Sequence, residues 1–390
     1  MFRFFAPAYI SAGFVSVLIG YAGAGAIIFQ AANAAGASTA EISSWLWALG
    51  IGMGVGCIGL TLWYKQPVSV AWSTPGAALL VTSLPGLSLN EAIGVFLFSS
   101  LLITLCGLTG LFRKIMDFMP QSMAAALLAA VLLRFGLDAF VAMEHDFLLV
   151  FIMLAVYIVA RHMTPRYVIP LTFLTGIIAA AVMGKIGAFH PEVAFTKPVF
   201  VMPAFDFPSL IGVGIPLFIV TMASQNVPGL AALRTHGYDA PASPLISWTG
   251  IIGLILAPFG GFAFNLAAIT AAICMSPDVH PDPKKRYPAS IWMGIFFCLA
   301  GLFGATITEL FTAFPSSLVM AIAGLALLAT IANSLHSAVQ DEDGREAAIL
   351  TFLVTASGMT LLSIGAPFWG LVFGMVAHLV KKRFTAVKNR

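Results

Sequence analysis

Residues 66–86 read QPVSVAWSTPGAALLVTSLPG, and residues 258–277 read PFGGFAFNLAAITAAICMSP. Both stretches are apolar, but proline and glycine interrupt them, whereas a spanning helix needs about 20 apolar residues in one run. Each stretch therefore predicts a broken span, in which an extended entry is followed by a half-helix. Thr74 in the first and Thr270 in the second lie about half of the 390-residue chain apart. Broken spans at matching places in two halves indicate the substrate site of a membrane transporter.

The chemistry of the first broken span favours a helix that starts at mid-membrane depth. Pro75 lacks a backbone N–H and pushes Thr74 toward an extended conformation. Ser73 or Thr74 then caps a half-helix that has Pro75 in its first turn. The alternative is a simple proline kink in one continuous helix. Backbone that is not helical at this depth persists only where it is buried in protein or lines a cavity.

The second broken span predicts the same arrangement from different residues. Gly260 and Gly261 allow the chain to turn, and residues 262–264 can then run extended. Asn265 is a favourable N-cap for a half-helix over residues 266–275. The alternative is a tight loop between two helices. Two half-helices that enter from opposite sides would bring their positive ends together, which is an anion site made largely of backbone N–H groups.

The composition places the chain among polytopic membrane proteins. Hydrophobic residues make up 60% of the chain, charged residues make up 9%, and the mean hydropathy is +0.98. We therefore expect an all-α membrane protein whose surroundings are the lipid bilayer, with no nucleic acid partner. The apolar runs predict about fourteen spans, over residues 8–31, 42–63, 68–84, 92–112, 120–138, 147–162, 167–184, 208–232, 243–259, 263–276, 288–308, 316–336, 347–363 and 365–380.

The basic residues predict the orientation. With the N-terminus inside the cell, 16 of the 19 lysines and arginines fall in cytoplasmic segments. The other side holds only Arg134, Lys185 and Lys197. The positive-inside rule therefore predicts that both termini are cytoplasmic and that the number of spans is even.

The second half of the sequence repeats the first at an offset of 195 residues. Residues 119–133 (MPQSMAAALLAAVLL) align with residues 314–328 (FPSSLVMAIAGLALL), and each segment predicts a helix with proline at its first position. Seven spans in each half make the two copies enter the membrane from opposite sides. The prediction is a seven-plus-seven inverted repeat whose broken members are spans 3 and 10. The alternative is chance similarity between two helices rich in alanine and leucine.

A third polar element lies within the span around residues 221–229, TMASQNVPG. Ser224, Gln225 and Asn226 are costly in an apolar span unless they find partners, so we expect them to face a cavity. The alternative is that they only join neighbouring helices by hydrogen bonds. In the matching span of the first half, Tyr21 either offers its hydroxyl to the same cavity or lies in the core.

The acidic residues narrow the choice of substrate. None of them lies beside Ser73, Gln225 or Asn265 in the sequence. A neutral polar pocket between two helix N-termini favours a monoanion over a cation. Arg134 and Asp138, four residues apart, are expected to form an ion pair at a helix end rather than to clamp a ligand.

Catalytic chemistry has no support in the sequence. The four cysteines lie in apolar runs without paired spacing, the seven histidines are scattered, and neither an HExxH nor a GxSxG pattern occurs. We therefore expect no metal and no organic cofactor, and a membrane-embedded enzyme is the least favoured alternative.

Four motifs carry a resemblance to a known family: SSWLWALG (43–50), AWSTPGAALL (71–80), VTMASQNVPG (220–229) and NLAAITAAIC (265–274). Along essentially its whole length the chain resembles the benzoate:proton symporter (BenE) family. The resemblance implies import of benzoate or a related aromatic carboxylate with a proton across the bacterial inner membrane. More distantly, the chain is similar to uracil permease and to sulfate and bicarbonate carriers. That similarity implies a nucleobase or an inorganic anion as the alternative substrate.

The distant carriers also imply a core and a gate that move against each other to give alternating access. On that pattern residues 1–113 and 207–312 form the core, and residues 114–206 and 313–390 form the gate, the latter ending in a basic cytoplasmic tail. Related carriers dimerise through the gate, so a homodimer is one expectation. Uracil permease carries glutamates on its eighth and tenth spans, but this chain has amides and serine there. The residue that carries the coupling proton is therefore left unassigned.

The expected substrate site gathers the polar residues of the broken spans. The carboxylate is expected between the helix ends, and the ring is expected against aromatic neighbours. The carboxylate contacts are assigned to Ser73, Thr74, Asn265, Gln225, Asn226 and Ser224, and the ring contacts to Tyr21, Phe262 and Phe264.

Overall fold

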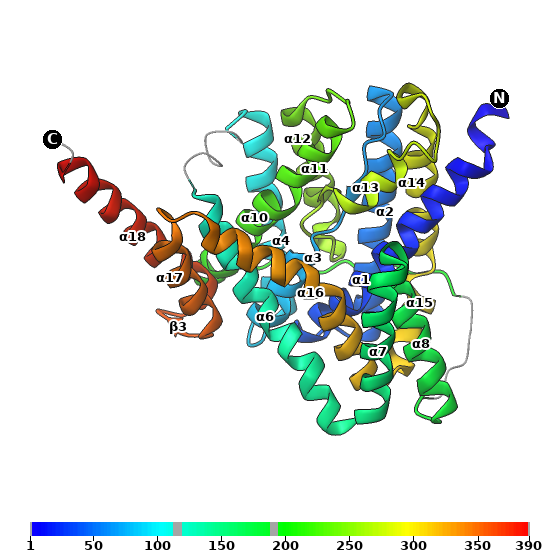
Figure 1. The fold of residues 1–390 in the computed structure, drawn as a ribbon, viewed down its shortest axis with the longest axis horizontal. Helices are drawn as coiled ribbons and strands as arrows, with labels where there is room; N and C mark the ends of the chain where they lie inside the picture. The colour runs from blue at the N-terminus through cyan, green and yellow to red at the C-terminus, as the bar shows by residue number, and fades with distance from the viewer. Residues whose placement is uncertain (1, 112–118, 188–193, 389–390) are drawn as a thin grey trace.

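A computed structural model describes residues 2–111, 119–187 and 194–388, and these are almost entirely helical (Figure 1). In the first half the helices are α1 (Pro7–Ala34), α2 (Thr39–Tyr64), α3 (Thr74–Ser83), α4 (Leu89–Leu108), α6 (Gln121–His145), α7 (Phe147–Met163) and α8 (Val168–Val182). In the second half they are α9 (Phe207–Ser209), α10 (Ile215–Thr221), α11 (Val227–Thr235), α12 (Ala242–Leu256), α13 (Ile269–Cys274), α14 (Pro288–Leu302), α15 (Gly304–Ala313), α16 (Ser316–Gln340), α17 (Arg345–Ala356) and α18 (Ala366–Lys388).

Two short strand pairs complete the fold. Strands β1 (Val70–Ala71) and β2 (Asn265–Leu266) form one pair, and β3 (Thr360–Leu361) and β4 (Ile364–Gly365) form a hairpin between α17 and α18. Two single-turn π-helices, η3 (Leu210–Gly214) and η4 (Met222–Asn226), join α9, α10 and α11 into one continuous helix. Short 3₁₀ turns lie at Phe2–Phe5, Pro165–Tyr167 (η2), Ala257–Phe259 (η5) and Pro283–Lys285.

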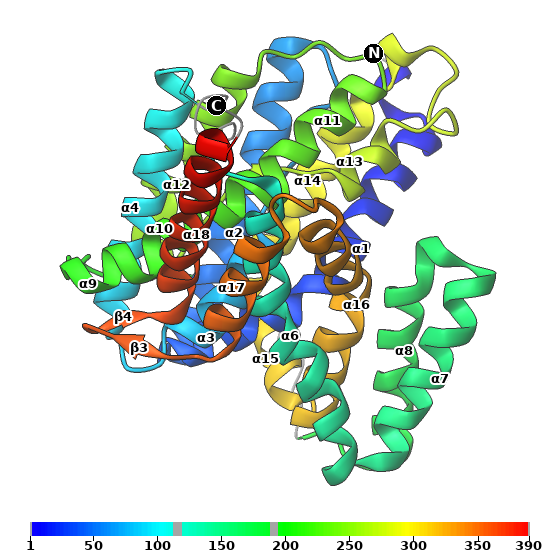
Figure 2. The ribbon, with the colours of Figure 1, turned by 60° about the vertical axis from the view of Figure 1, so that its left-hand side comes forward.

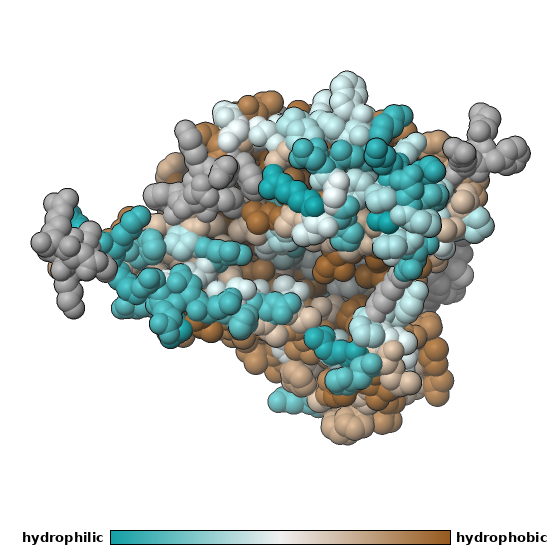
Figure 3. Space-filling model, turned by 45° about the horizontal axis from the view of Figure 1, so that its top comes forward, coloured by the Kyte–Doolittle hydropathy of each residue, from teal (hydrophilic) through white to brown (hydrophobic). Residues whose placement is uncertain are grey.

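The helices have the length and composition of membrane spans. Among the described residues, seven helices are long and apolar enough to cross a bilayer, and an eighth is added if α14 and α15, which meet at a 66° bend, count as one span. Large apolar side chains also cover the outer surface, among them Trp63, Val182 and Ile255, each more than half exposed. In Figure 3 the top of Figure 1 is tilted toward the reader. Hydrophilic residues gather on this upper face, and apolar residues cover the lower side. The protein is a mostly helical membrane protein, and the count of fourteen spans stays a prediction.

Capping boxes fix the starts of α2 and α4. The Glu41 carboxylate accepts a hydrogen bond from the Ser38 backbone N–H at 2.7 Å, and Ser88 and Glu91 make the same contact. Each box satisfies donors that a helix start otherwise leaves unpaired. Both acids therefore lie at helix ends.

Small residues let the helices of one group, here called the first helix group and containing α2, α4, α12 and α14, pack closely. α2 packs along α14, and α4 packs along α12. A Cβ added to Gly50 would lie 2.6 Å from the Gly301 Cα, and one added to Gly250 would lie 2.6 Å from the Thr104 backbone nitrogen. Such contacts leave no room for a side chain and are typical of helix interfaces in membranes.

A second group of helices is built on α6 and α16. These two helices pack along each other, and α7, α8, α17 and α18 pack around them (Figure 2). Both begin directly after a proline, Pro120 or Pro315, and both are 25 residues long. The prolines are the N-caps rather than the predicted first helical residues, because their ψ angles of 132° and 142° are extended. The division into core and gate stays a prediction, and its first boundary, with Arg113 and Lys114, lies outside the described residues.

Candidate functional site

The two broken spans meet through their extended segments. β1 and β2 pair antiparallel, with Val70 opposite Leu266 and Ala71 opposite Asn265. The Ala267 N–H extends the pairing by donating to the Ser69 carbonyl at 2.9 Å. In this way each segment supplies the hydrogen-bond partners that a non-helical backbone needs inside a membrane. Segments from opposite halves of the sequence are thereby held side by side.

The first broken span has the predicted extended entry and half-helix. The Ser73 hydroxyl accepts the Gly76 N–H at 2.9 Å, so Ser73 and not Thr74 is the N-cap of α3. The Ser73 carbonyl accepts the Ala77 N–H at 2.8 Å, and Pro75 has no N–H to offer. α3 therefore uses up most of its own free donors. Only the backbone N–H and hydroxyl of Thr74 make no hydrogen bond within the described part of the chain.

The second broken span differs from the prediction at its cap. The chain turns at Gly260, where φ is +92°, and then runs extended, but Asn265 lies in β2 and does not cap a helix. Its side-chain amide donates to the Ala263 carbonyl at 2.9 Å. Asn265 is held by its pairing with β1 and by the Ala263 carbonyl. The helix therefore starts four residues later, at Ile269.

The start of α13 is consequently rich in free donors. Ala268 occupies the N-cap position and offers no side-chain cap. Within the described residues, the backbone N–H groups of Ile269, Thr270 and Ala271 make no hydrogen bond. The positive end of the second half-helix is thus the more open of the two.

Asn226 is a positioning residue for β2. Its side-chain oxygen accepts the Leu266 N–H at 2.9 Å, and its amide nitrogen contacts the Met222 sulfur at 3.1 Å. The residue is fully buried at the end of η4. A Cβ added to Gly229, one turn further along, would lie 2.5 Å from the Leu266 carbonyl oxygen. Asn226 therefore joins the long helix to the second broken span.

We expect Asn226→Leu to destabilise the fold by about 2 kcal/mol, because the Leu266 N–H would then be buried without an acceptor. Thermal unfolding of purified protein in detergent measures the loss. The exposed Asn333 of α16 is the matched control, and Asn333→Leu should change stability by about 0.5 kcal/mol or less. Equal stabilities for the two variants would contradict the positioning role.

A cavity of about 650 Å³, here called the central cavity, lies where the half-helices meet the second helix group. It reaches Thr74, Ser224 and Gln225 of the predicted residues, together with Ala268, Ile269 and Thr270 at the start of α13. Its walls also contain the apolar side chains of Ile19, Met53, Trp72, Ile169, Phe297 and Leu327. No charged side chain lines it among the described residues. Gln225 makes no hydrogen bond within the described chain, so its amide is available to a ligand.

The other predicted residues lie behind the cavity wall. Tyr21 stacks edge-on against Trp72, at 4.8 Å between ring centroids, and its buried hydroxyl has no partner among the described residues. Phe262 and Phe264 are fully buried in the first helix group, where Phe262 contacts Trp45 and Phe96. The cavity is not lined by Tyr21, Phe262, Phe264, Ser73, Asn226 or Asn265. The aromatic residues that line the cavity are Trp72 and Phe297 rather than Tyr21, Phe262 and Phe264.

Two cavity residues outside the predicted contact set are nevertheless indicated by the sequence. Trp72 directly precedes the cap Ser73, and Thr270 lies within one residue of the position that the repeat offset matches with Thr74. Met53 and Phe297 sit within ordinary apolar spans, where no local pattern separates a cavity wall from a core. They reach the cavity only because α2 and α14 pack beside the broken spans.

Comparison with known proteins places the chain in a family. The family model described as "Benzoate membrane transport protein" (BenE) matches residues 3–380. The chain belongs to the BenE family. This BenE-family protein is 51% identical over 374 residues to inner membrane protein YdcO of Escherichia coli, with 96% of each chain covered. It is 40% identical over 369 residues to the benzoate membrane transport protein of Acinetobacter baylyi, covering 95% of this chain and 94% of that one.

Solved structures share the fold of the BenE-family protein. The transmembrane domain of the cyanobacterial bicarbonate transporter BicA matches with a TM-score of 0.61, 12% identity and 98% of each chain covered. The anion transporter SLC26A9 matches with a TM-score of 0.65 and 12% identity, covering 97% of this chain and 66% of that chain. At this identity the likeness concerns the fold alone. The family assignment supports a membrane transporter.

Proposed function

We propose that this BenE-family protein imports benzoate or a related aromatic carboxylate across the bacterial inner membrane, with a proton and by alternating access. The observation that carries the proposal is the central cavity, which combines free helix-start donors, a free amide and apolar walls without a charged residue among those described. A ligand suited to it has one anionic end and one apolar body. The curated relative in Acinetobacter baylyi, 40% identical, is named for benzoate.

The carboxylate is assigned to the start of α13. Backbone N–H groups at a helix start bind anions because they are unpaired and lie at the positive end of the helix dipole. Ile269 and Thr270 offer such groups, and Thr74 and Gln225 face the same cavity from the other two elements. The absence of a carboxylate from the described cavity wall removes the repulsion that an anion would meet there.

The ring is assigned to the apolar wall. Trp72 and Phe297 present aromatic surface, and Met53 supplies a flexible side chain that fills irregular space. Binding sites for small molecules are mostly apolar, with a few polar groups that fix the orientation. An inorganic anion would gain nothing from this wall, which favours an aromatic carboxylate over an inorganic anion.

Alternating access is proposed as a movement of the group containing α6–α8 and α16–α18 against the remaining helices. The central cavity lies between these groups, since α8 and α16 line it opposite α1 and α13. We place both termini in the cytoplasm from the distribution of basic residues. A homodimer through the second group is part of the same proposal.

A displacement assay decides between substrate classes. Labelled benzoate bound to purified protein is expected to be displaced by ring-substituted benzoates but not by uracil or bicarbonate. Displacement by uracil or bicarbonate alone would favour the nucleobase or inorganic-anion alternative.

Proton coupling is tested by imposing the two driving forces separately on proteoliposomes. An inwardly directed proton gradient with the potential clamped to zero is expected to drive benzoate accumulation above that of protein-free vesicles. The protein-free vesicles correct for benzoic acid that crosses the lipid unaided. Accumulation that follows the membrane potential and ignores the proton gradient would refute symport.

A further inference from the structure

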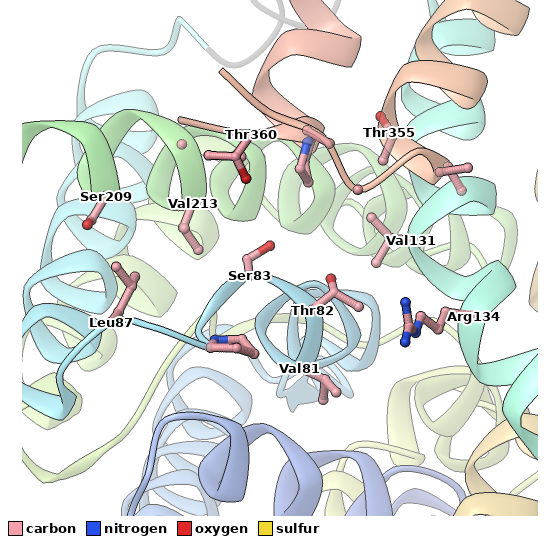
Figure 4. Close-up of a pocket in the computed structure, with 18 of the residues that line it drawn as sticks. Val81, Thr82, Ser83, Leu87, Val131, Arg134, Ser209, Val213, Thr355 and Thr360 are labelled. Atoms are coloured by element: carbon pink, nitrogen blue, oxygen red, sulfur yellow. The ribbon is translucent and has the colours of Figure 1, made fainter. Parts of the chain in front are cut away.

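A second cavity of about 610 Å³, here called the polar cavity, lies at the opposite end of α3 from the central cavity. Thr74 at the start of α3 lines the central cavity, whereas Thr82 and Ser83 at its end line the polar cavity. A ten-residue helix is about 15 Å long, which separates the two spaces. Figure 4 shows the polar cavity, with α3 on one side and Thr355 and Thr360 on the other.

Arg134 and Asp138 of α6 both line this cavity, and the predicted ion pair between them does not form. Neither side chain makes an ion pair or hydrogen bond within the described residues. Figure 4 shows the Arg134 guanidinium projecting from α6 toward Thr82. The spacing of four residues suits a helix pair, but the space between α6 and α3 lets Arg134 point into the cavity instead.

The linings of the two cavities match at the offset of the sequence repeat. Val131 and Phe135 of α6 line the polar cavity, and Ala326 and Thr330 of α16, each 195 positions later, line the central cavity. The segments around the starts of α8 and α18 line the two cavities at matching positions as well. The central cavity has Pro165, Val168 and Pro170, and the polar cavity has Thr360, Ser363 and Gly365, again 195 positions later. At these five positions the polar cavity therefore has the repeat counterparts of residues that line the central cavity, with the two halves exchanged.

We infer that the polar cavity is the external mouth of the transport path and contains a capture site for the carboxylate of the substrate, with Arg134 as its binding residue. The inference rests on the proposed function and orientation, in which the matched cavity opens to the other side of the membrane. Positions 329 and 333, which repeat Arg134 and Asp138, are Ala329 and Asn333. The charges therefore belong to the polar cavity only.

The chemistry of the polar cavity calls for such a residue. The carboxyl end of α3 points into it, and a helix C-terminus repels an anion. A guanidinium group offsets that repulsion and binds a carboxylate through two parallel hydrogen bonds. The hydroxyls of Thr82 and Thr360 lie in the same wall. Asp138 adds one negative charge to the same wall, which weakens the attraction for an anion.

Charge-selective labelling tests the inference without relying on transport. A cysteine introduced as Thr82→Cys is exposed in right-side-out vesicles to membrane-impermeant thiosulfonates, one anionic and one cationic. We expect the anionic reagent to label faster, Arg134→Gln to abolish that preference, Arg134→Lys to keep it, and external benzoate to slow labelling. The control is Ser276→Cys at the central cavity, labelled in inside-out vesicles because that cavity opens to the cytoplasmic side in the proposed orientation, and there Arg134→Gln should have no effect.

Uptake kinetics give the second measurement. Arg134→Gln is expected to raise the KM for external benzoate about fivefold or more while leaving the maximal rate and folded yield near those of the unsubstituted protein. The capture site would be overturned if Thr82→Cys were not labelled from outside. It would also be overturned if Arg134→Gln left both the charge preference and the KM unchanged. Failure of the unsubstituted protein to take up benzoate would instead overturn the proposed substrate, because the charge preference in labelling does not depend on it.

Discussion

Gln225→Glu is expected to lower benzoate affinity at pH 8 by about 100-fold or more. The substitution keeps the size of the side chain but puts a negative charge into a cavity whose described wall has none. A like charge next to a bound anion costs several kcal/mol, and about 1.4 kcal/mol corresponds to a tenfold change in affinity. Titration of purified protein with benzoate measures the effect.

The control for this prediction is Gln121→Glu. Gln121 is exposed in the first turn of α6 and lines neither cavity, so the same chemical change should leave affinity within about twofold. Gln225→Met, which removes the amide without adding charge, is expected to weaken binding by about tenfold, the value of one or two hydrogen bonds. If Gln225→Glu bound benzoate like the unsubstituted protein, the carboxylate would not lie where we propose.

Gly260→Ala is expected to destabilise the protein by about 3 kcal/mol and to reduce the yield of folded protein. Gly260 has φ of +92°, and a Cβ added there would lie 1.9 Å from the Trp45 ring. The positive φ alone costs a residue with a Cβ about 1–2 kcal/mol, and overpacking a core costs about 1–3 kcal/mol more. Thermal unfolding and size-exclusion profiles in detergent measure the change.

Gly86 separates the two contributions. Its φ is also +92°, but a Cβ added there meets nothing within 4 Å. Gly86→Ala should therefore cost only the backbone contribution, about 1–2 kcal/mol. A similar cost at both glycines would mean that the packing of Trp45 against Gly260 does not hold the extended segment in place.

The parts of the site that sequence predicts well are those decided by neighbouring residues. Ser73 and Pro75 determine the start of α3 within one turn, and the structure follows that prediction. Gly260 likewise marks the turn into the second broken span. The repeat offset pointed to Thr270 as the partner of Thr74, although the side chains around them come from both halves of the chain.

The parts that sequence predicts poorly depend on distant segments. Asn265 has the chemistry of an N-cap, but pairing with Ala71 keeps it extended. Phe262 looks like a ring contact, but Trp45 and Phe96 enclose it. Arg134 has the spacing of an ion pair, but the hairpin between α17 and α18, which belongs to the other half of the chain, helps to form a cavity in front of it. Patterns of neighbouring residues do not predict these contacts, because the contacting residues are distant in the sequence.

The pairing of β1 with β2 also bears on how the protein is made. β1 belongs to the first half of the chain, so it leaves the ribosome long before the strand that satisfies its backbone, and closing so long a loop is slow. Until then the first half holds unpaired peptide groups inside the membrane, where they are costly. Neither half can form the β1–β2 pair by itself. We therefore expect the two halves to fold as a single unit.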